Sequence, residues 1–176
     1  MKKIVLTGPE STGKSTLARA LAARFGAPLV EEYGRTYCER FGNDCDALDL
    51  VHIAAGHLYH EDLAAATNPE VLLLDTDLIV TETYAELYLG YCPPLITELA
   101  QARTYDLWLL LDTDWPYVPD SIRRFADRRR AHFDQLRNLL DERGKPYLVL
   151  SGPFEERLAT AEHTIEALLK KPASTG

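Results

Sequence analysis

Short apolar runs alternate along the chain with longer segments in which apolar residues recur every three or four positions. The apolar runs predict strands at residues 4–7, 27–30, 71–74, 106–112 and 146–150. The amphipathic segments predict helices at residues 15–25, from about 35 to 41, 47–66, 78–88, 94–103, 127–143 and 153–169. Strands that are apolar throughout are covered on both faces. The alternation therefore predicts an α/β fold, a three-layer α/β/α sandwich around a five-stranded parallel sheet.

The best-defined segment lies between the first predicted strand and the helix after it. Residues 8–16 read Gly-Pro-Glu-Ser-Thr-Gly-Lys-Ser-Thr, which fits G-x-x-x-x-G-K-[ST], the phosphate-binding loop. Two glycines permit a tight turn that gathers backbone N–H groups around an anion, and the helix adds its positive dipole end. A nucleoside triphosphate with Mg²⁺ is the expected ligand. The candidate contacts are Gly8, Glu10, Ser11, Thr12, Gly13, Lys14, Ser15 and Thr16, with Ser15 also a candidate ligand of Mg²⁺.

Acidic side chains follow the third predicted strand. Asp75 closes the strand, where P-loop proteins place a second acidic group for Mg²⁺, so we expect Asp75 to bind or orient the metal. The alternative is a solvated aspartate that caps the next helix, and Asp77 fits that role better. Asp77 remains a candidate substrate contact as well.

A second acidic pair ends the second predicted strand. A carboxylate there, at Glu31 or Glu32, could accept the proton of a hydroxyl that attacks the γ-phosphate, or hydrogen-bond a ribose diol. Tyr33 and Arg35 follow with an aromatic ring and a fixed cation, and are candidate substrate contacts. The competing interpretation is a helix start, where the dipole favours acidic residues anyway.

The segment around residues 113–130 contains two prolines and the densest group of basic residues in an otherwise acidic chain. Its arginines are Arg123, Arg124, Arg128, Arg129 and Arg130. An arginine on a mobile loop can stabilise charge on a transferring phosphoryl group. The alternative is a solvated helix face paired with nearby aspartates. Trp115 could cover a flat substrate or anchor the loop.

Length and composition limit the number of domains and the classes of binding partner that we expect. The chain has 176 residues, enough for one domain, which we place at residues 1–170 with a flexible tail at 171–176. A net charge of −8 argues against a broad nucleic-acid surface, and no apolar run reaches membrane-spanning length. Three cysteines without a C-x-x-C pair suit a reducing cytoplasm. We interpret the five scattered histidines as surface or packed residues rather than a metal site. We interpret Tyr84, Tyr88 and Tyr91 as core and rim residues rather than a stacking platform.

Taken together, the glycine loop, the Glu-Tyr-Gly-Arg run at 32–35, the Asp-Thr-Asp run at 75–77 and the segment 115–123 resemble the ribosylnicotinamide kinase domain of the NadR-type NAD-biosynthesis family. The resemblance covers nearly the whole chain. It implies a P-loop kinase that uses ATP and Mg²⁺ to phosphorylate the 5′-hydroxyl of nicotinamide riboside, giving nicotinamide mononucleotide. Larger members also carry a DNA-binding segment and a nucleotidyltransferase domain. This sequence shows no counterpart, so adenylyl transfer and repression are not implied.

The resemblance also implies residue roles. Glu32 would be the base or position the hydroxyl, Asp75 would serve the metal, Lys14 would bind the phosphates, and Arg123 with Arg130 would come from a lid. One rival is a P-loop kinase of another nucleoside or small-molecule alcohol. The other is a regulatory nucleotide-binding ATPase. A GTPase switch is disfavoured because the chain lacks the Asn-Lys-x-Asp guanine motif.

Overall fold

A computed structural model describes residues 1–118 and 126–170. Its centre is a five-stranded sheet in which every pairing is parallel, with the strand order β2-β3-β1-β4-β5. The strands are β1 (Lys2–Thr7), β2 (Leu29–Val30), β3 (Val71–Asp75), β4 (Leu107–Leu111) and β5 (Tyr147–Leu150). The predicted fold class and strand count are confirmed. β2 is shorter than predicted because Pro28 has no N–H for the ladder, although its carbonyl accepts a bond from Leu73 N at 3.1 Å.

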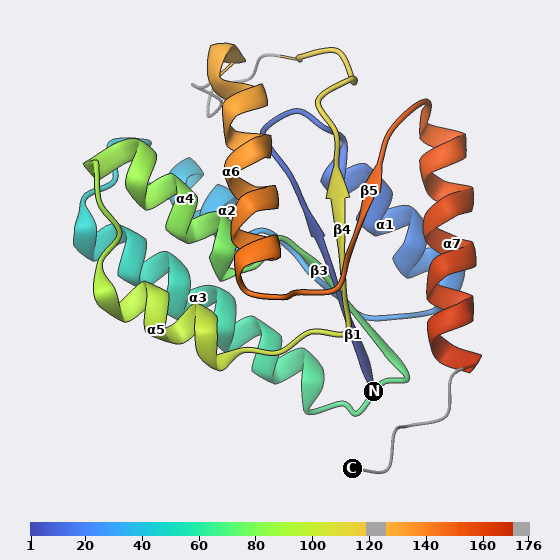
Figure 1. The fold of residues 1–176 in the computed structure, drawn as a ribbon. Helices are drawn as coiled ribbons and strands as arrows, with labels where there is room; N and C mark the ends of the chain where they lie inside the picture. Colours follow the sequence, from blue (N-terminus) through green and yellow to red (C-terminus); the bar gives the residue numbers. More distant parts are fainter. Residues whose placement is uncertain (119–125, 171–176) are drawn as a thin grey trace.

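Helices cover both faces of this sheet (Figure 1). Within the described ranges they are α1 (Lys14–Phe25), α2 (Tyr33–Phe41), α3 (Ala47–Ala65), α4 (Leu78–Leu89), α5 (Pro94–Ala102), α6 (Arg129–Glu142) and α7 (Phe154–Lys170). A 3₁₀ turn, η1 (Ala126–Arg128), precedes α6, so the helix predicted from residue 127 begins as a tighter turn. α1 and α7 lie together on one side, and α6 lies on the other with α3, α4 and α5 beyond it.

The central strand divides its side chains between the two layers. Ile4 and Leu6 of β1 pack with Leu17 and Leu21 of α1, whereas Val5 packs with the layer that contains Phe133 of α6. This period of two is the geometry of a strand, and covering both faces requires apolar residues at every position. The side chains of Ile4, Val5 and Leu6 are completely buried. Leu63 of α3 lies outside this core and is 51% exposed.

The parallel arrangement brings the carboxyl ends of all five strands to one edge, where ligands of open α/β sheets bind. The glycine loop follows β1 there, and the Asp75–Asp77 segment follows β3. β1 pairs directly with both β3 and β4, so these segments are neighbours. Among the described helices, none has the length and apolar character needed to cross a bilayer.

Asp77 lies at the N-cap of α4 but is buried in the core beneath it. The indole Nε1 of Trp108 donates a 2.8 Å hydrogen bond to Asp77 Oδ2, and Asp77 is 1% exposed. Burial raises the pKa of Asp77 from its usual 3.8 to about 6, while the Trp108 bond and the Val80 and Ile79 amides oppose the rise. Asp77 therefore anchors the start of α4 to the sheet, and its predicted substrate role has no support from its position.

Tyr33 packs against α3 at a position without a side chain. A Cβ atom added to Gly56 would overlap the Tyr33 ring, so only glycine allows this close approach. The Tyr33 ring also lies near the His60 ring of α3, and the two ring centroids are 5.4 Å apart. This contact fixes the start of α2, and with it the neighbouring Glu32.

Asp77→Asn should remove a pH-dependent stability cost. The pKa of Asp77 is higher in the folded state, so its favourable contribution is complete below about pH 4 and is lost as the pH rises through 6. An asparagine oxygen can still accept the Trp108 bond. Urea unfolding at pH 7 should show the variant more stable than wild type by up to about 3 kcal/mol, with the two converging near pH 4. An equal difference at both pH values would contradict the assignment.

Gly56→Ala should lower stability by about 1–2 kcal/mol, because overpacking against the Tyr33 ring outweighs the gain in helix propensity. The matched control is Gly34→Ala in α2, where the new Cβ would meet Ile53 Cγ2 at an ordinary 3.4 Å. Thermal unfolding should show a lower Tm for Gly56→Ala alone. A Tm unchanged in both variants would mean that the ring moves aside without cost.

Candidate functional site

The glycine loop has backbone torsions that few residues adopt. Gly8 has φ 142°, and a Cβ there would lie 2.8 Å from the carbonyl oxygen of Leu111 at the end of β4. Gly13, the N-cap of α1, has φ 88°, and Ser11 between them has φ 57°. Both motif glycines therefore occupy positions where a side chain would strain the backbone or strike the neighbouring strand. The loop has the compact turn that the motif predicts.

The carbonyl groups of residues 8–12 each accept a hydrogen bond from a cationic side chain. Lys14 Nζ donates to the carbonyl oxygens of Gly8 and Pro9, both at 2.8 Å, and Lys14 is itself buried. The Thr12 hydroxyl adds a 2.9 Å bond to the Pro9 carbonyl. The first half of the loop is thus held by the lysine and threonine of its own motif.

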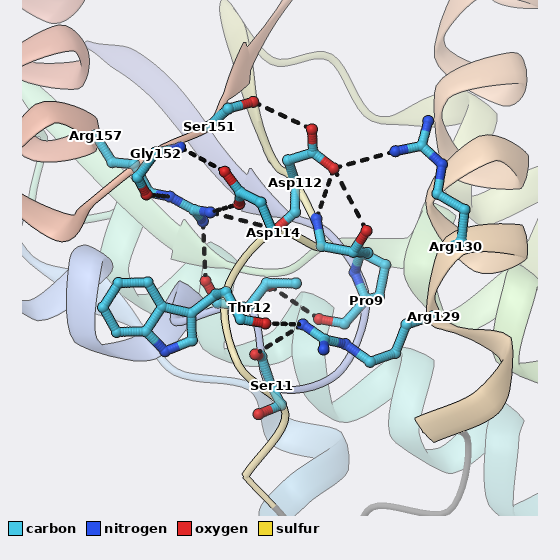
Figure 2. Close-up of polar contacts among 12 residues, drawn as sticks. Pro9, Ser11, Thr12, Asp112, Asp114, Arg129, Arg130, Ser151, Gly152 and Arg157 are labelled. Carbon is cyan, nitrogen blue, oxygen red and sulfur yellow. Dashed lines mark hydrogen bonds and ion pairs between the residues drawn. The ribbon is translucent and has the colours of Figure 1, made fainter.

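Two arginines from the far end of the chain hold the second half (Figure 2). Arg129 donates to the carbonyls of Glu10 and Ser11, each at 3.1 Å. Arg157 donates to the carbonyl of Thr12 at 3.1 Å. Carbonyls that are turned toward cations leave the amide sides of the same peptides to face the other way, which is what an anion-binding nest requires.

Arg157 joins the glycine loop to two further loops. It is 2% exposed, donates to the Gly152 carbonyl at 2.8 Å, and forms an ion pair with Asp114. Asp114 in turn accepts a bond from Gly152 N. A buried arginine is stable only when its charge is paired and its donors are satisfied, and here both conditions hold. Figure 2 shows the three loops meeting at this side chain.

A second polar centre lies beside the loop at the end of β3. Asp75 is 3% exposed, and burial raises the pKa of its carboxyl, opposed by the Lys14 charge and by the hydrogen bond from the Ser15 hydroxyl. Asp75 Oδ1 is buried without a hydrogen-bond partner in the described part of the chain. Thr76 follows with φ 84°, an unusual torsion for a β-branched residue. Ser15, the other predicted metal ligand, thus lies near enough to lower the pKa of the Asp75 carboxyl.

Glu32, rather than Glu31, faces the glycine loop. Glu31 forms an exposed 3.2 Å ion pair with Arg19, whereas Glu32 lines the cavity described below. Burial raises the pKa of Glu32, the Lys14 ammonium lowers it, and the Asp75 carboxyl raises it further. Glu32, Asp75 and Lys14 thus form one electrostatic group. A carboxylate with a raised pKa is a stronger proton acceptor than an ordinary one.

One cavity connects this group to an aromatic region between α2, α3 and α4. From the predicted set it is lined by Glu10, Ser11, Thr12, Gly13, Lys14, Ser15, Thr16, Glu32 and Arg35. The other lining residues are mostly apolar or aromatic and include Leu50, Ile53, His57, Tyr84 and Tyr88. A phosphate-binding loop and a carboxylate therefore open onto the same space as a surface suited to a flat ring. Tyr33 and Asp77 are not among the lining residues; both pack elsewhere, as described above.

Trp115 lines a second cavity, which shares Thr12, Gly13 and Thr16 with the first. This cavity is lined by Thr12, Gly13, Thr16, Leu17, Leu111, Trp115, Phe154 and Arg157. Trp115 therefore does not line the cavity that Glu32 and Arg35 line. Its carbonyl accepts a 2.9 Å bond from Arg129, so the alternative role of Trp115, as an anchor of its loop, fits the contacts.

Of the predicted lid arginines Arg123 and Arg130, the structure describes the contacts of Arg130 alone. Arg130 forms ion pairs with Asp112 at 3.2 Å and Asp134 at 2.9 Å, and does not line either cavity. The pairing with Asp134 is the alternative that the sequence also allowed. Arg123 and Arg124 lie outside the described residues. Arg129, from the same basic cluster, is the arginine that reaches the glycine loop.

Sequence reasoning missed several residues of this site. Arg157 and His57 carried no motif, and Tyr84 and Tyr88 were interpreted as core and rim although they line the cavity. The tyrosines share one face of α4 because they are four residues apart, which was the available signal. Arg157 gave none, since its partner Thr12 is 145 positions away.

Comparisons with known sequences agree with the motif analysis. A family model described as AAA domain (AAA_28) matches residues 3–157. The trifunctional NAD biosynthesis/regulator protein NadR of Salmonella typhimurium is 33% identical over 148 residues, and that of Escherichia coli 34% over 149. Each match covers 81% of this chain but only 36% and 35% of the relative. The chain thus spans little more than a third of the curated relatives it matches.

Solved structures extend the comparison to the fold. A NadR protein in complex with NR has a TM-score of 0.83 at 27% identity, covering 97% of this chain and 52% of that one. A NadR protein in complex with NAD and AMP-PNP has a TM-score of 0.79 at 26% identity, covering 99% and 51%. Thymidylate kinase from Ehrlichia chaffeensis, at 16% identity and a TM-score of 0.63 over 95% and 98% of the two chains, shares the fold. These matches confirm the NadR-type resemblance, and by the span of the family model the chain belongs to the AAA domain family of P-loop proteins.

Proposed function

We propose that the protein is an ATP-dependent kinase that phosphorylates the 5′-hydroxyl of nicotinamide riboside to give nicotinamide mononucleotide. The observation that carries the proposal is the single cavity that glycine-loop residues share with Glu32 and the aromatic side chains of α4. Such a cavity can hold a triphosphate tail, a hydroxyl and a flat ring in one line. The structural similarity to a NadR protein bound to NR supports this acceptor.

ATP phosphates fit the glycine loop, where Lys14 adds a point charge that can move from its own carbonyls to the β- and γ-phosphates. The AMP-PNP complex of a similar NadR protein supports ATP as the donor. We assign the adenine ring to the second cavity, between Trp115, Phe154 and the start of α1. A flat base can stack there while its phosphates cross the loop toward the first cavity.

Mg²⁺ fits the pair Ser15 and Asp75. Asp75 offers a buried carboxylate oxygen with no hydrogen-bond partner within the described ranges, and the Ser15 hydroxyl lowers the pKa of that carboxyl. Mg²⁺ typically takes one or two protein oxygens and completes its shell with phosphates and water. When bound, the ion would neutralise charge on the phosphate oxygens.

Glu32 is the proposed proton acceptor. The acceptor hydroxyl gives its proton to the Glu32 carboxylate, its oxygen forms a bond to the γ-phosphorus, and the bond to the β-γ bridging oxygen breaks to release ADP. The raised pKa of Glu32 suits this role because it brings the proton affinity of the carboxylate closer to neutral pH. Arg35, 3.9 Å from the Glu32 carboxylate, keeps a compensating positive charge beside it.

Purified protein with ATP and Mg²⁺ should convert nicotinamide riboside to its 5′-monophosphate, measured by chromatography of the product. Lys14→Ala should abolish turnover, because the loop loses both its phosphate charge and two of its carbonyl contacts. Transfer to other nucleosides but not to nicotinamide riboside would move the assignment to a different acceptor. ATP hydrolysis with no transfer to any nucleoside would favour a regulatory ATPase.

Glu32→Gln should lower kcat by about 10²–10⁴-fold while leaving the KM for ATP near the wild-type value, since the amide keeps the shape but not the basicity. Glu31→Gln is the matched control, because the neighbouring carboxylate is exposed and paired with Arg19. Its kinetics should resemble those of wild type. A near-normal kcat for Glu32→Gln would show that another group accepts the proton.

A further inference from the structure

His57 is a buried imidazole in the α3 wall of the first cavity. It is 2% exposed and lines the cavity, yet neither Nδ1 nor Nε2 has a hydrogen-bond partner among the described residues. Leaving a buried polar group unsatisfied costs about 1–3 kcal/mol, so native proteins rarely do so without a functional reason. Because the side chain borders a cavity, a bound molecule can supply the missing partner.

A second buried histidine shows how the fold satisfies such a group when it serves structure. His132 of α6 is also 2% exposed, but its Nε2 lies 2.7 Å from the hydroxyl of Thr83. That hydroxyl donates to the Val80 carbonyl at 2.8 Å, so it accepts from the imidazole. The fold thus provides a partner for His132 and none, within the described ranges, for either nitrogen of His57.

The acidic neighbour one turn along α3 is already occupied by other groups. Glu61 accepts a 2.7 Å bond from Lys3 Nζ and a 2.8 Å bond from the Tyr105 hydroxyl. Burial lowers the pKa of His57 to about 4, Glu61 opposes this, and His60 and Arg103 add to it. At neutral pH the ring is therefore uncharged, with one nitrogen that donates and one that accepts. A neutral ring can also lie near the cationic pyridinium of nicotinamide riboside without repulsion.

The charged groups that act on His57 differ from those that act on Glu32. Glu32 is influenced by Lys14, Asp75, Arg35 and Glu10, around the glycine loop, whereas His57 is influenced by groups of α3 and by Arg103. The cavity therefore joins two distinct polar environments. Glu32 lines one part of this cavity, and Ile53, Tyr84 and His57 also line it, so a nucleoside whose reacting hydroxyl lies at Glu32 would have these three residues as candidate contacts for its base.

We propose that His57 is a specificity-determining residue that hydrogen-bonds the carboxamide of the acceptor's nicotinamide ring. This assignment rests on the proposed kinase function and identifies which part of the acceptor the enzyme recognises. A carboxamide offers both an N–H donor and a carbonyl acceptor, so it can satisfy His57 in either tautomer. A site built to hydrogen-bond a substrate group rejects an analogue that lacks the group, because its own polar atom is then left buried and unpaired.

The experiment compares nicotinamide riboside with pyridinium riboside, which lacks the carboxamide, at saturating ATP and Mg²⁺. Wild type should prefer nicotinamide riboside by about tenfold or more in kcat/KM. His57→Leu should reduce that preference to near unity, mainly by raising the KM for nicotinamide riboside, with kcat retained. His57→Gln, which keeps a donor and an acceptor, should restore part of the preference.

A purely structural role for His57 makes the opposite prediction for stability. Removing an unsatisfied polar group should leave the Tm of His57→Leu equal to or above that of wild type, whereas loss of a structural contact would lower it. His52→Leu, on an exposed position of the same helix, is the matched control and should change neither the acceptor preference nor the KM.

The outcomes separate the two proposals. If wild type phosphorylates nicotinamide riboside but prefers neither nucleoside, or if His57→Leu changes both reactions equally, the His57 assignment is overturned and the kinase function stands. If wild type phosphorylates neither nucleoside, both fall. Should His57→Leu not fold, the wild-type preference and the His57→Gln variant still decide.

Discussion

The site depends on hydrogen bonds between three cationic side chains and five successive carbonyl groups of the glycine loop. Lys14 comes from the loop itself, whereas Arg129 and Arg157 come from the helices α6 and α7 near the end of the chain. Charge-assisted bonds of this kind are stronger than neutral ones, and the most buried of them, from Arg157, is shielded from water. They fix the peptide planes of the loop so that its amide groups can converge on an anion. Phosphate binding is thus prepared by contacts that involve carbonyls rather than amides.

The parallel sheet supplies the second constraint, because it brings the ends of β1, β2 and β3 to one edge. The loop after β1 then lies next to Asp75 at the end of β3, and Glu32 after β2 completes an acidic wall. Burial keeps the proton affinity of both carboxyls high, and Lys14 balances their charge. Two cavities border the loop, one the proposed place for the nucleotide base and the other the proposed place for the acceptor.

Local patterns were sufficient to predict the fold class, the number of strands and the glycine loop. Each of these depends on residues close in sequence or on the geometry of parallel strands. Side-chain direction was harder to predict. Tyr33 packs on Gly56, and Asp77 bonds the indole of a strand that begins 30 positions later. Arg157 and His57 could not be identified, because their roles depend on a carbonyl and a cavity that exist only in the folded chain.

The central claim is that one cavity aligns a triphosphate, a carboxylate and a nucleoside hydroxyl. A crystal structure of the protein with nicotinamide riboside and a non-hydrolysable ATP analogue tests it most directly. The account predicts that the 5′-oxygen lies within hydrogen-bond distance of the Glu32 carboxylate and in line with the γ-phosphorus. A nucleoside bound in the cavity beside Trp115, or one whose 5′-oxygen points away from Glu32, would contradict it.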